Sequence, residues 1–96
     1  MERLKLPLSP GEMMPRFHFH VWTNGTLVKD TIGLQCDSRR EACSHALESM
    51  PGLLSDGLRE RHDTYVSTEV RNDQDRIVAV VRGTVVLEER PLDDAG

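Results

Sequence analysis

The chain contains no long hydrophobic run and no signal-peptide pattern. No apolar stretch approaches the roughly 20 residues that a membrane-spanning helix requires. Glu2, Arg3 and Lys5 stand near the first residue, but no continuous apolar segment follows them as it does in a signal peptide. We therefore expect a cytoplasmic protein without a membrane partner. Its 96 residues suffice for one domain with a thin core.

Cysteine is scarce as well. Cys36 and Cys43 are the two cysteines of the chain, and their Cys-x6-Cys spacing matches no zinc knuckle or redox turn. In a chain without an export signal, such a pair is typical of reduced, partly buried thiols. We expect neither a disulfide nor cysteine chemistry.

An excess of basic residues is also missing. Residues 15–87 carry nine Lys and Arg against ten Asp and Glu, a net charge of −1, and residues 88–96 add −3. Proteins that bind nucleic acid usually present a basic stripe to the phosphates, so we expect no nucleic-acid partner. The sequence also lacks a Gly-rich phosphate loop and a Gly-x-Ser-x-Gly nucleophile elbow, which argues against an enzyme.

What the chain does contain is a clear strand followed by a turn. Residues 16–22 alternate in character, which is typical of a strand with two different faces. One face carries Phe17, Phe19 and Val21. The other carries His18, His20 and Trp22. Asn24-Gly25 then supplies residues that tolerate positive φ, which predicts a type I′ hairpin turn into a second strand over about residues 26–31.

A helix is predicted to begin after Ser38, because Ser38-Arg39-Arg40-Glu41 fits a capping box in which Glu41 reaches back to the cap amide. Apolar residues at three- and four-residue spacing then form a stripe that would pack on a sheet: Ala42, Ala46, Leu47, Met50, Leu54 and Leu58. Pro51 interrupts this pattern. It predicts either a kink at Met50 or a break, with Pro51 opening a second short helix.

Two more strands follow, over residues 64–71 and 76–81, and the second is expected to resume from Gly83 to Leu87 with a bulge or bend at Gly83. The predicted fold is therefore α+β in the order ββαββ. Two antiparallel hairpins form one sheet, and a kinked or broken helix packs on one face. We expect a mobile N-terminal arm over residues 1–13, a single domain over 14–87 and an acidic tail over 88–96.

The opening Met14-Pro15-Arg16-Phe17-His18-Phe19-His20 resembles that of a family of small bacterial proteins catalogued as a domain of unknown function. Asp30-Thr31-Ile32-Gly33 is similar to the Asp-x-x-Gly step of that family, and Glu41-Ala42 with Ala46 is similar to its helix start. The chain departs from the pattern at His18, at Pro51-Gly52 and at Asp75, which replaces the usual turn glycine. The resemblance covers roughly residues 14–81 and implies the ββαββ fold pattern without any site residues. Apart from this resemblance, Met14-Pro15 looks like a second beginning, so translation could also start at Met14.

His18 and His20 are the candidate metal ligands. Residues two apart on a strand point the same way, so two imidazoles could share a zinc ion. A zinc site would need further ligands from His45, His62, Asp63 or Cys36, and nothing in the sequence brings these together. The alternative interpretation is that both histidines are sheet residues that take part in packing or in a subunit contact.

The sheet face opposite the helix is the candidate interaction surface. One helix covers one face of a four-stranded sheet, and the other face would display His18, His20, Trp22 and Tyr65. The last strand would add Val78 and Val80 to this face, or alternatively Ile77, Ala79 and Val81. An apolar face of this kind is rarely left in water, so we expect a homodimer through this face or through an edge strand, with a further protein partner as an extension. The leading hypothesis is a non-enzymatic, self-associating protein-interaction module. The alternatives are a zinc-binding or hydrolytic domain and an antitoxin-like regulator, the last by analogy of fold alone.

Overall fold

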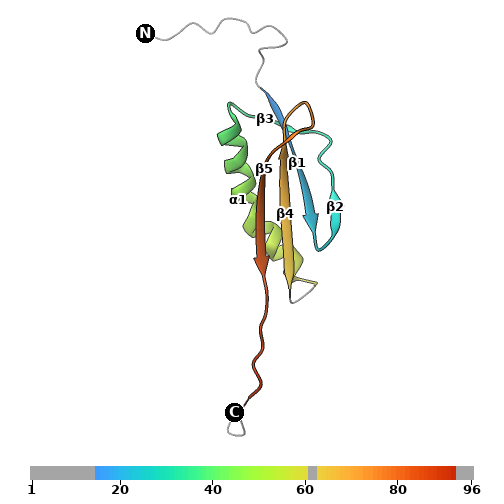
Figure 1. The fold of residues 1–96 in the computed structure, drawn as a ribbon, viewed down its shortest axis with the longest axis vertical. Coiled ribbons are helices and arrows are strands. Elements are labelled where there is room, and N and C mark those ends of the chain that lie inside the picture. Colours follow the sequence, from blue (N-terminus) through green and yellow to red (C-terminus); the bar gives the residue numbers. More distant parts are fainter. Residues whose placement is uncertain (1–14, 61–62, 93–96) are drawn as a thin grey trace, which may run out of the picture.

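The fold is an antiparallel sheet with one helix packed on one face (Figure 1). The computed structural model describes residues 15–60 and 63–92. The elements are β1 (Arg16–Thr23), β2 (Thr26–Val28), β3 (Leu34–Gln35), α1 (Arg39–Leu58), β4 (Thr64–Arg71) and β5 (Ile77–Val85). The strand order is β2-β1-β4-β5, and β3 pairs with the start of β1. The predicted α+β fold with two hairpins in one sheet is confirmed.

Some predictions lie outside the described residues. These concern the N-terminal arm over residues 1–13, the start at Met14, the contribution of His62 and the last four residues of the acidic tail. Residues 86–92 follow β5 without regular secondary structure, and Figure 1 shows them running away from the sheet. Within the described ranges, no helix combines the length and the apolar character needed to cross a membrane.

The first hairpin has the turn that its sequence predicts. Asn24 and Gly25 have φ angles of 49° and 90°, the left-handed pair that a type I′ turn requires. The second strand is shorter than predicted, because β2 ends at Val28 and does not continue to Thr31. From there the chain leaves β1 and returns to it only at β3, which the sequence did not predict as a strand.

Helix α1 begins as its capping box predicts. Ser38 is extended, with a φ of −158°, and its Oγ accepts from the amide of Glu41 at 3.1 Å. The reciprocal bond differs from the prediction, since the Glu41 carboxylate accepts from the amide of Asp37 and not from that of Ser38. The helix then continues through Pro51 to Leu58 without a break. Pro51 and Leu47 both lie on the exposed side, where water can bind the carbonyl that loses its helical donor.

The side of α1 that faces the sheet is built from small residues. Its buried positions are Ala42, Ala46, Met50 and Gly57. Leu47 and Leu58 were predicted in this stripe, but 59% of Leu47 and 37% of Leu58 are exposed. Ala42, Ala46 and Met50 are four residues apart and lie on the side of the helix that faces the sheet. Leu47 follows Ala46 directly, so its side chain lies on a different side of the helix, toward solvent. Small side chains let the helix lie close to β4 and β5.

The strand β5 is continuous through Gly83, so the predicted bulge or bend there is wrong. The register irregularity lies at the other end of the strand, opposite the Val70–Arg71 step of β4. Gly83 instead makes room for the helix. A Cβ atom at this position would lie 2.7 Å from the Sδ of Met50 and 3.1 Å from a Leu54 methyl.

The two faces of the sheet differ in what covers them. We call the face packed against α1 the inner face and the opposite one the outer face. The inner face contributes Phe17, Val66 and Val70 to the core, and Cys36 joins them from the loop before α1. Figure 1 shows α1 lying beside β4 and β5, while β2 is the strand farthest from it.

The turn between β4 and β5 holds a strained residue. Asp75 has a φ of 64°, a conformation that costs a non-glycine residue roughly 1 kcal/mol. Its side chain contributes only an exposed 3.3 Å ion pair to Arg71. We therefore expect Asp75→Gly to raise the free energy of unfolding by about 0.5–1 kcal/mol in chemical denaturation. A loss of stability would show that the Asp75 ion pair outweighs the backbone strain.

Candidate functional site

The outer face brings together most of the residues predicted to form an interaction surface. The sheet register places His20, Glu69 and Val80 in one row across β1, β4 and β5. The next row contains Trp22, and Tyr65 lies beyond it beside the hairpin turn. Val78, predicted on the same face, lies at the bulge of β5 and packs against the core.

A polar network occupies the centre of this face. The indole N–H of Trp22 donates to Glu69 Oε2 at 3.2 Å, and Arg71 donates to Glu69 Oε1 from Nε and Nη2 at 3.0 and 2.8 Å. Arg71 Nη1 also donates to the carboxylate and carbonyl of Asp75. The middle of the outer face is thus charged and hydrogen-bonded, and its apolar residues lie toward the margins. Glu69 and Arg71 carry opposite charges two residues apart on one strand, and this spacing is the sequence pattern that could have indicated their ion pair.

The network shifts the ionisation of its members. The hydrogen bond from Arg71 is the largest influence on Glu69, and with the Trp22 bond it outweighs burial and lowers the pKa of Glu69. The same contact with Glu69 raises the pKa of Arg71. Both groups therefore stay charged at neutral pH.

The predicted metal pair is held in a way that disfavours zinc. The rings of His18 and His20 share the outer face, with centroids 6.4 Å apart. The Nδ1 of His20 accepts from the amide of Asp30 at 3.1 Å, so the neutral ring carries its proton on Nε2 and offers a metal no free nitrogen. Metal-bound histidines show the opposite pattern, since their second nitrogen donates.

Further zinc ligands do not converge on these rings. Over residues 15–60 and 63–92, no three His, Cys, Asp or Glu side chains are placed to hold a metal ion. Cys36 is buried in the core on the inner face. His45 lies on α1, where its Nε2 is 4.0 Å from a Glu41 oxygen. Asp63 accepts from the amide of Leu87.

Asp30 is the carboxylate of the described chain that accepts from the most backbone amides. Its Oδ1 accepts from the amides of Ile32 and Gly33 at 3.0 and 2.9 Å, and its Oδ2 accepts from the amide of Phe19 at 3.1 Å. Burial would raise its pKa, but these amide bonds outweigh burial and leave the pKa of Asp30 lowered. Phe19 lies between the segment of β1 that pairs with β2 and the segment that pairs with β3. The Asp30 side chain therefore accepts the hydrogen bond from the Phe19 amide that neither strand accepts. This explains the Asp-x-x-Gly step physically, as a structural clamp.

Gly33 completes this clamp. It has a φ of 81°, and a Cβ atom there would lie 2.8 Å from both Arg16 Cγ and His18 Cε1. The position therefore requires glycine for its backbone angle and for the close approach of β1 side chains.

The two cysteines differ in burial. Both are free thiols, with Cys36 buried and Cys43 partly buried. Burial, together with the nearby carboxylates of Glu41 and Asp37, raises the pKa of the Cys36 thiol. A raised pKa keeps a thiol protonated and unreactive.

The outer edge of β5 is a row of unpaired backbone groups. The amide of Asn24 donates to the carbonyl of Tyr65 at 2.9 Å, so the backbone of Tyr65 faces β1. Backbone direction alternates along a strand, so Val66 faces its β5 partner Gly83. The residues on either side of Gly83 therefore point their N–H and C=O groups away from β4. These edge residues are Val80, Arg82 and Thr84.

Comparison with known proteins identifies a family. A family model described as "Domain of unknown function (DUF6894)" matches residues 16–84. This range contains the whole of α1 and all the strands, apart from the last residue of β5. No curated protein and no solved structure matches the chain.

Proposed function

We propose that this chain, which belongs to the DUF6894 family, is a non-enzymatic protein-interaction module whose copies pair through β5. The observation that supports this proposal is the free edge of β5. It is a nine-residue strand at the end of the sheet, and within the described residues nothing pairs with its outer side.

Edge strands normally carry features that prevent pairing with another chain, such as lysine, proline or a bulge in the middle of the strand. In β5 the irregularity lies near its first residues, and Arg82 is the strand's one charged residue. Val80 is 38% exposed at this edge. An edge that is long and regular from Ala79 onward favours addition of a further strand.

The position of Arg82 disfavours one register for two antiparallel copies. Pairing Arg82 with its own equivalent would place like charges directly opposite, which destabilises a sheet. A shift that sets Val80 opposite the second copy's arginine keeps the free edges paired. It also puts Val81 beside the two-fold axis on the inner face. The resulting dimer continues the sheet from one copy into the other.

Proline at position 82 tests this proposal. The N–H of Arg82 points away from β4, so Arg82→Pro removes no hydrogen bond within the chain but blocks strand addition. We expect wild type and Arg82→Ala to be dimers at high micromolar concentration in light scattering, and Arg82→Pro to be a monomer with an unchanged far-ultraviolet spectrum. A monomeric wild type, or a dimeric proline variant, would contradict pairing through β5.

A further inference from the structure

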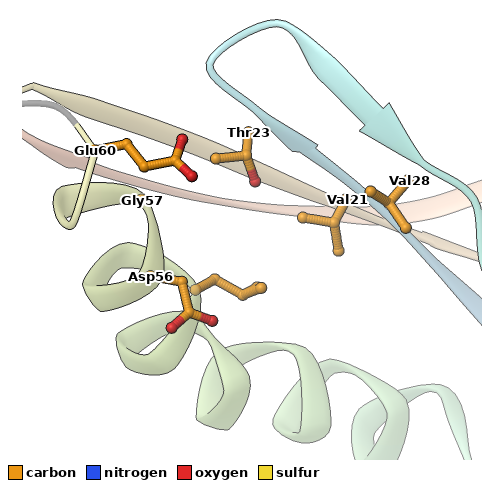
Figure 2. A pocket seen from close by; sticks show the side chains of 7 residues that line it. Val21, Thr23, Val28, Asp56, Gly57 and Glu60 are labelled. Atoms are coloured by element: carbon orange, nitrogen blue, oxygen red, sulfur yellow. The ribbon is translucent and has the colours of Figure 1, made fainter.

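A groove separates the β1–β2 hairpin from the C-terminal half of α1. Its volume is about 340 Å³, and it is lined by Val21, Thr23, Val28, Leu53, Asp56, Gly57 and Glu60. In Figure 2, Val21 and Val28 project from the hairpin toward the helix, and the carboxylates of Asp56 and Glu60 stand at the helix end. The groove exists because α1 packs on β4 and β5 and leaves the inner face of the hairpin uncovered.

The hairpin side of the groove is aliphatic. Val28 belongs to the inner face, because its register partner is Val21, yet 63% of Val28 is exposed. Leu53 faces it from the helix. A volume of this size falls within the range of sites that take a small ligand or a few side chains.

Acidic residues outnumber basic ones at the described end of the helix, over residues 56–60. Helices generally place basic residues in their last turn, where the macrodipole is negative, but the last turn of α1 contains none. Asp56 and Glu60 add two carboxylates there. Arg59 approaches Asp56 at 3.9 Å, but both side chains are more than 70% exposed, at 77% and 72%, so this ion pair is weak and one negative charge remains in excess.

We propose that this groove binds an extended peptide segment of a partner protein that carries an aliphatic residue and, two positions later, a lysine or arginine. Residues two apart on a strand point to the same side, so both side chains enter the groove together. The aliphatic one contacts Val28 and Leu53, and the basic one reaches Asp56 and Glu60. The strand β2 is the other edge of the sheet, so the peptide backbone can pair beside it. This inference is independent of pairing through β5.

Three synthetic peptides test the groove by NMR titration of the full chain. The probe is acetyl-Ser-Leu-Ser-Lys-Ser-amide. One control has Glu in place of Lys, and the other has Ala in place of Leu. We expect the Lys peptide to shift the methyl signals of Val21, Val28 and Leu53 and to bind at least about fivefold more tightly than either control. Equal binding of the Lys and Glu peptides, absence of binding, or shifts confined to other residues would overturn the proposal.

Variants of the exposed groove residues separate charge from apolar contact. Asp56→Asn combined with Glu60→Gln should bring the Lys and Glu peptides to within about twofold of each other. Val28→Thr keeps the shape of the side chain and should weaken the Lys peptide about threefold. The variant Arg82→Pro should bind the Lys peptide as wild type does. Loss of peptide binding in this variant would instead place the peptide site on β5.

Discussion

Replacing Gly57 with alanine is expected to lower the free energy of unfolding by about 2 kcal/mol, although alanine is the better helix former. Gly57 is buried in α1, and a Cβ atom there would overlap the Cγ2 of Thr64 and lie 3.1 Å from its Oγ1. Thr64 is fully buried and β-branched, so its methyl group has no free rotamer to move into. So close an overlap lies at the upper end of the range for overpacking, about 3 kcal/mol, and subtracting the roughly 1 kcal/mol that alanine gains in helix propensity leaves a net loss of about 2 kcal/mol. Urea denaturation measures the difference.

The same helix provides the control. Gly52 has nothing within 4 Å of its Cβ position, so Gly52→Ala should stabilise the protein by about 0.5–1 kcal/mol. Thr64→Ser removes the obstructing methyl group, and combined with Gly57→Ala it should recover about 1 kcal/mol relative to the sum of the single changes. Equal effects of the two glycine changes would show that propensity, and not contact with β4, decides the role of Gly57.

Local patterns predicted the elements of this fold because each is formed largely by neighbouring residues. The alternation in residues 16–22 places Phe17 in the core, and Asn24-Gly25 by itself requires the left-handed turn. The Ser38 cap likewise depends on residues within one helical turn. In these places the sequence-based prediction is confirmed, since the deciding contacts are close in the chain.

The errors lie where distant residues decide. The local sequence around Gly83 predicts a bulge or bend, but glycine is needed there because Met50 and Leu54 of α1 lie too close for a larger side chain. Pro51 predicts a kink or a break, but α1 continues through it without a break because the exposed side of the helix tolerates the missing bond. The early end of β2 depends on a carboxylate that binds a strand eleven residues away. Strand propensity carries no information about such contacts.

The candidate site was predictable in part for the same reason. Period-two alternation alone is enough to place His18, His20 and Trp22 on one face of a strand. The polar centre of that face depends on the register between β1 and β4, which brings Glu69 beside His20 and within reach of the Trp22 indole. The free edge of β5 depends on strand order, and the groove depends on which strands the helix covers. Neither can be read from a single sequence.

Removing the Asp30 carboxylate is expected to destabilise the protein more than any other single surface change. Asp30→Ala leaves three amides without an acceptor, among them the part-buried amide of Phe19 in the middle of β1. A bond to a charged acceptor contributes about 1.5–3 kcal/mol, and the bonds to Phe19 and Gly33 are the two part-buried ones, so we expect a total loss of about 3 kcal/mol and a fall in Tm of roughly 12–24 °C. Asp73→Ala, in the exposed β4–β5 turn, is the matched control and should change stability by less than about 0.5 kcal/mol.

The charge of Asp30 adds a pH dependence that separates it from a purely geometric role. Its pKa is lowered in the folded chain, so its ionised form stabilises the fold above the unfolded value of about 4, and this contribution is lost as pH falls through the folded value. Asp30→Asn keeps an oxygen for the Ile32 and Gly33 amides but turns an NH₂ group toward the amide of Phe19, which should cost about 1–2 kcal/mol at pH 7. The stability difference between wild type and Asp30→Asn should therefore shrink as the pH is lowered below about 4. A difference that stays constant from pH 7 to pH 3 in denaturant titrations would mean that the amide bonds, and not the ionised carboxylate, account for the clamp.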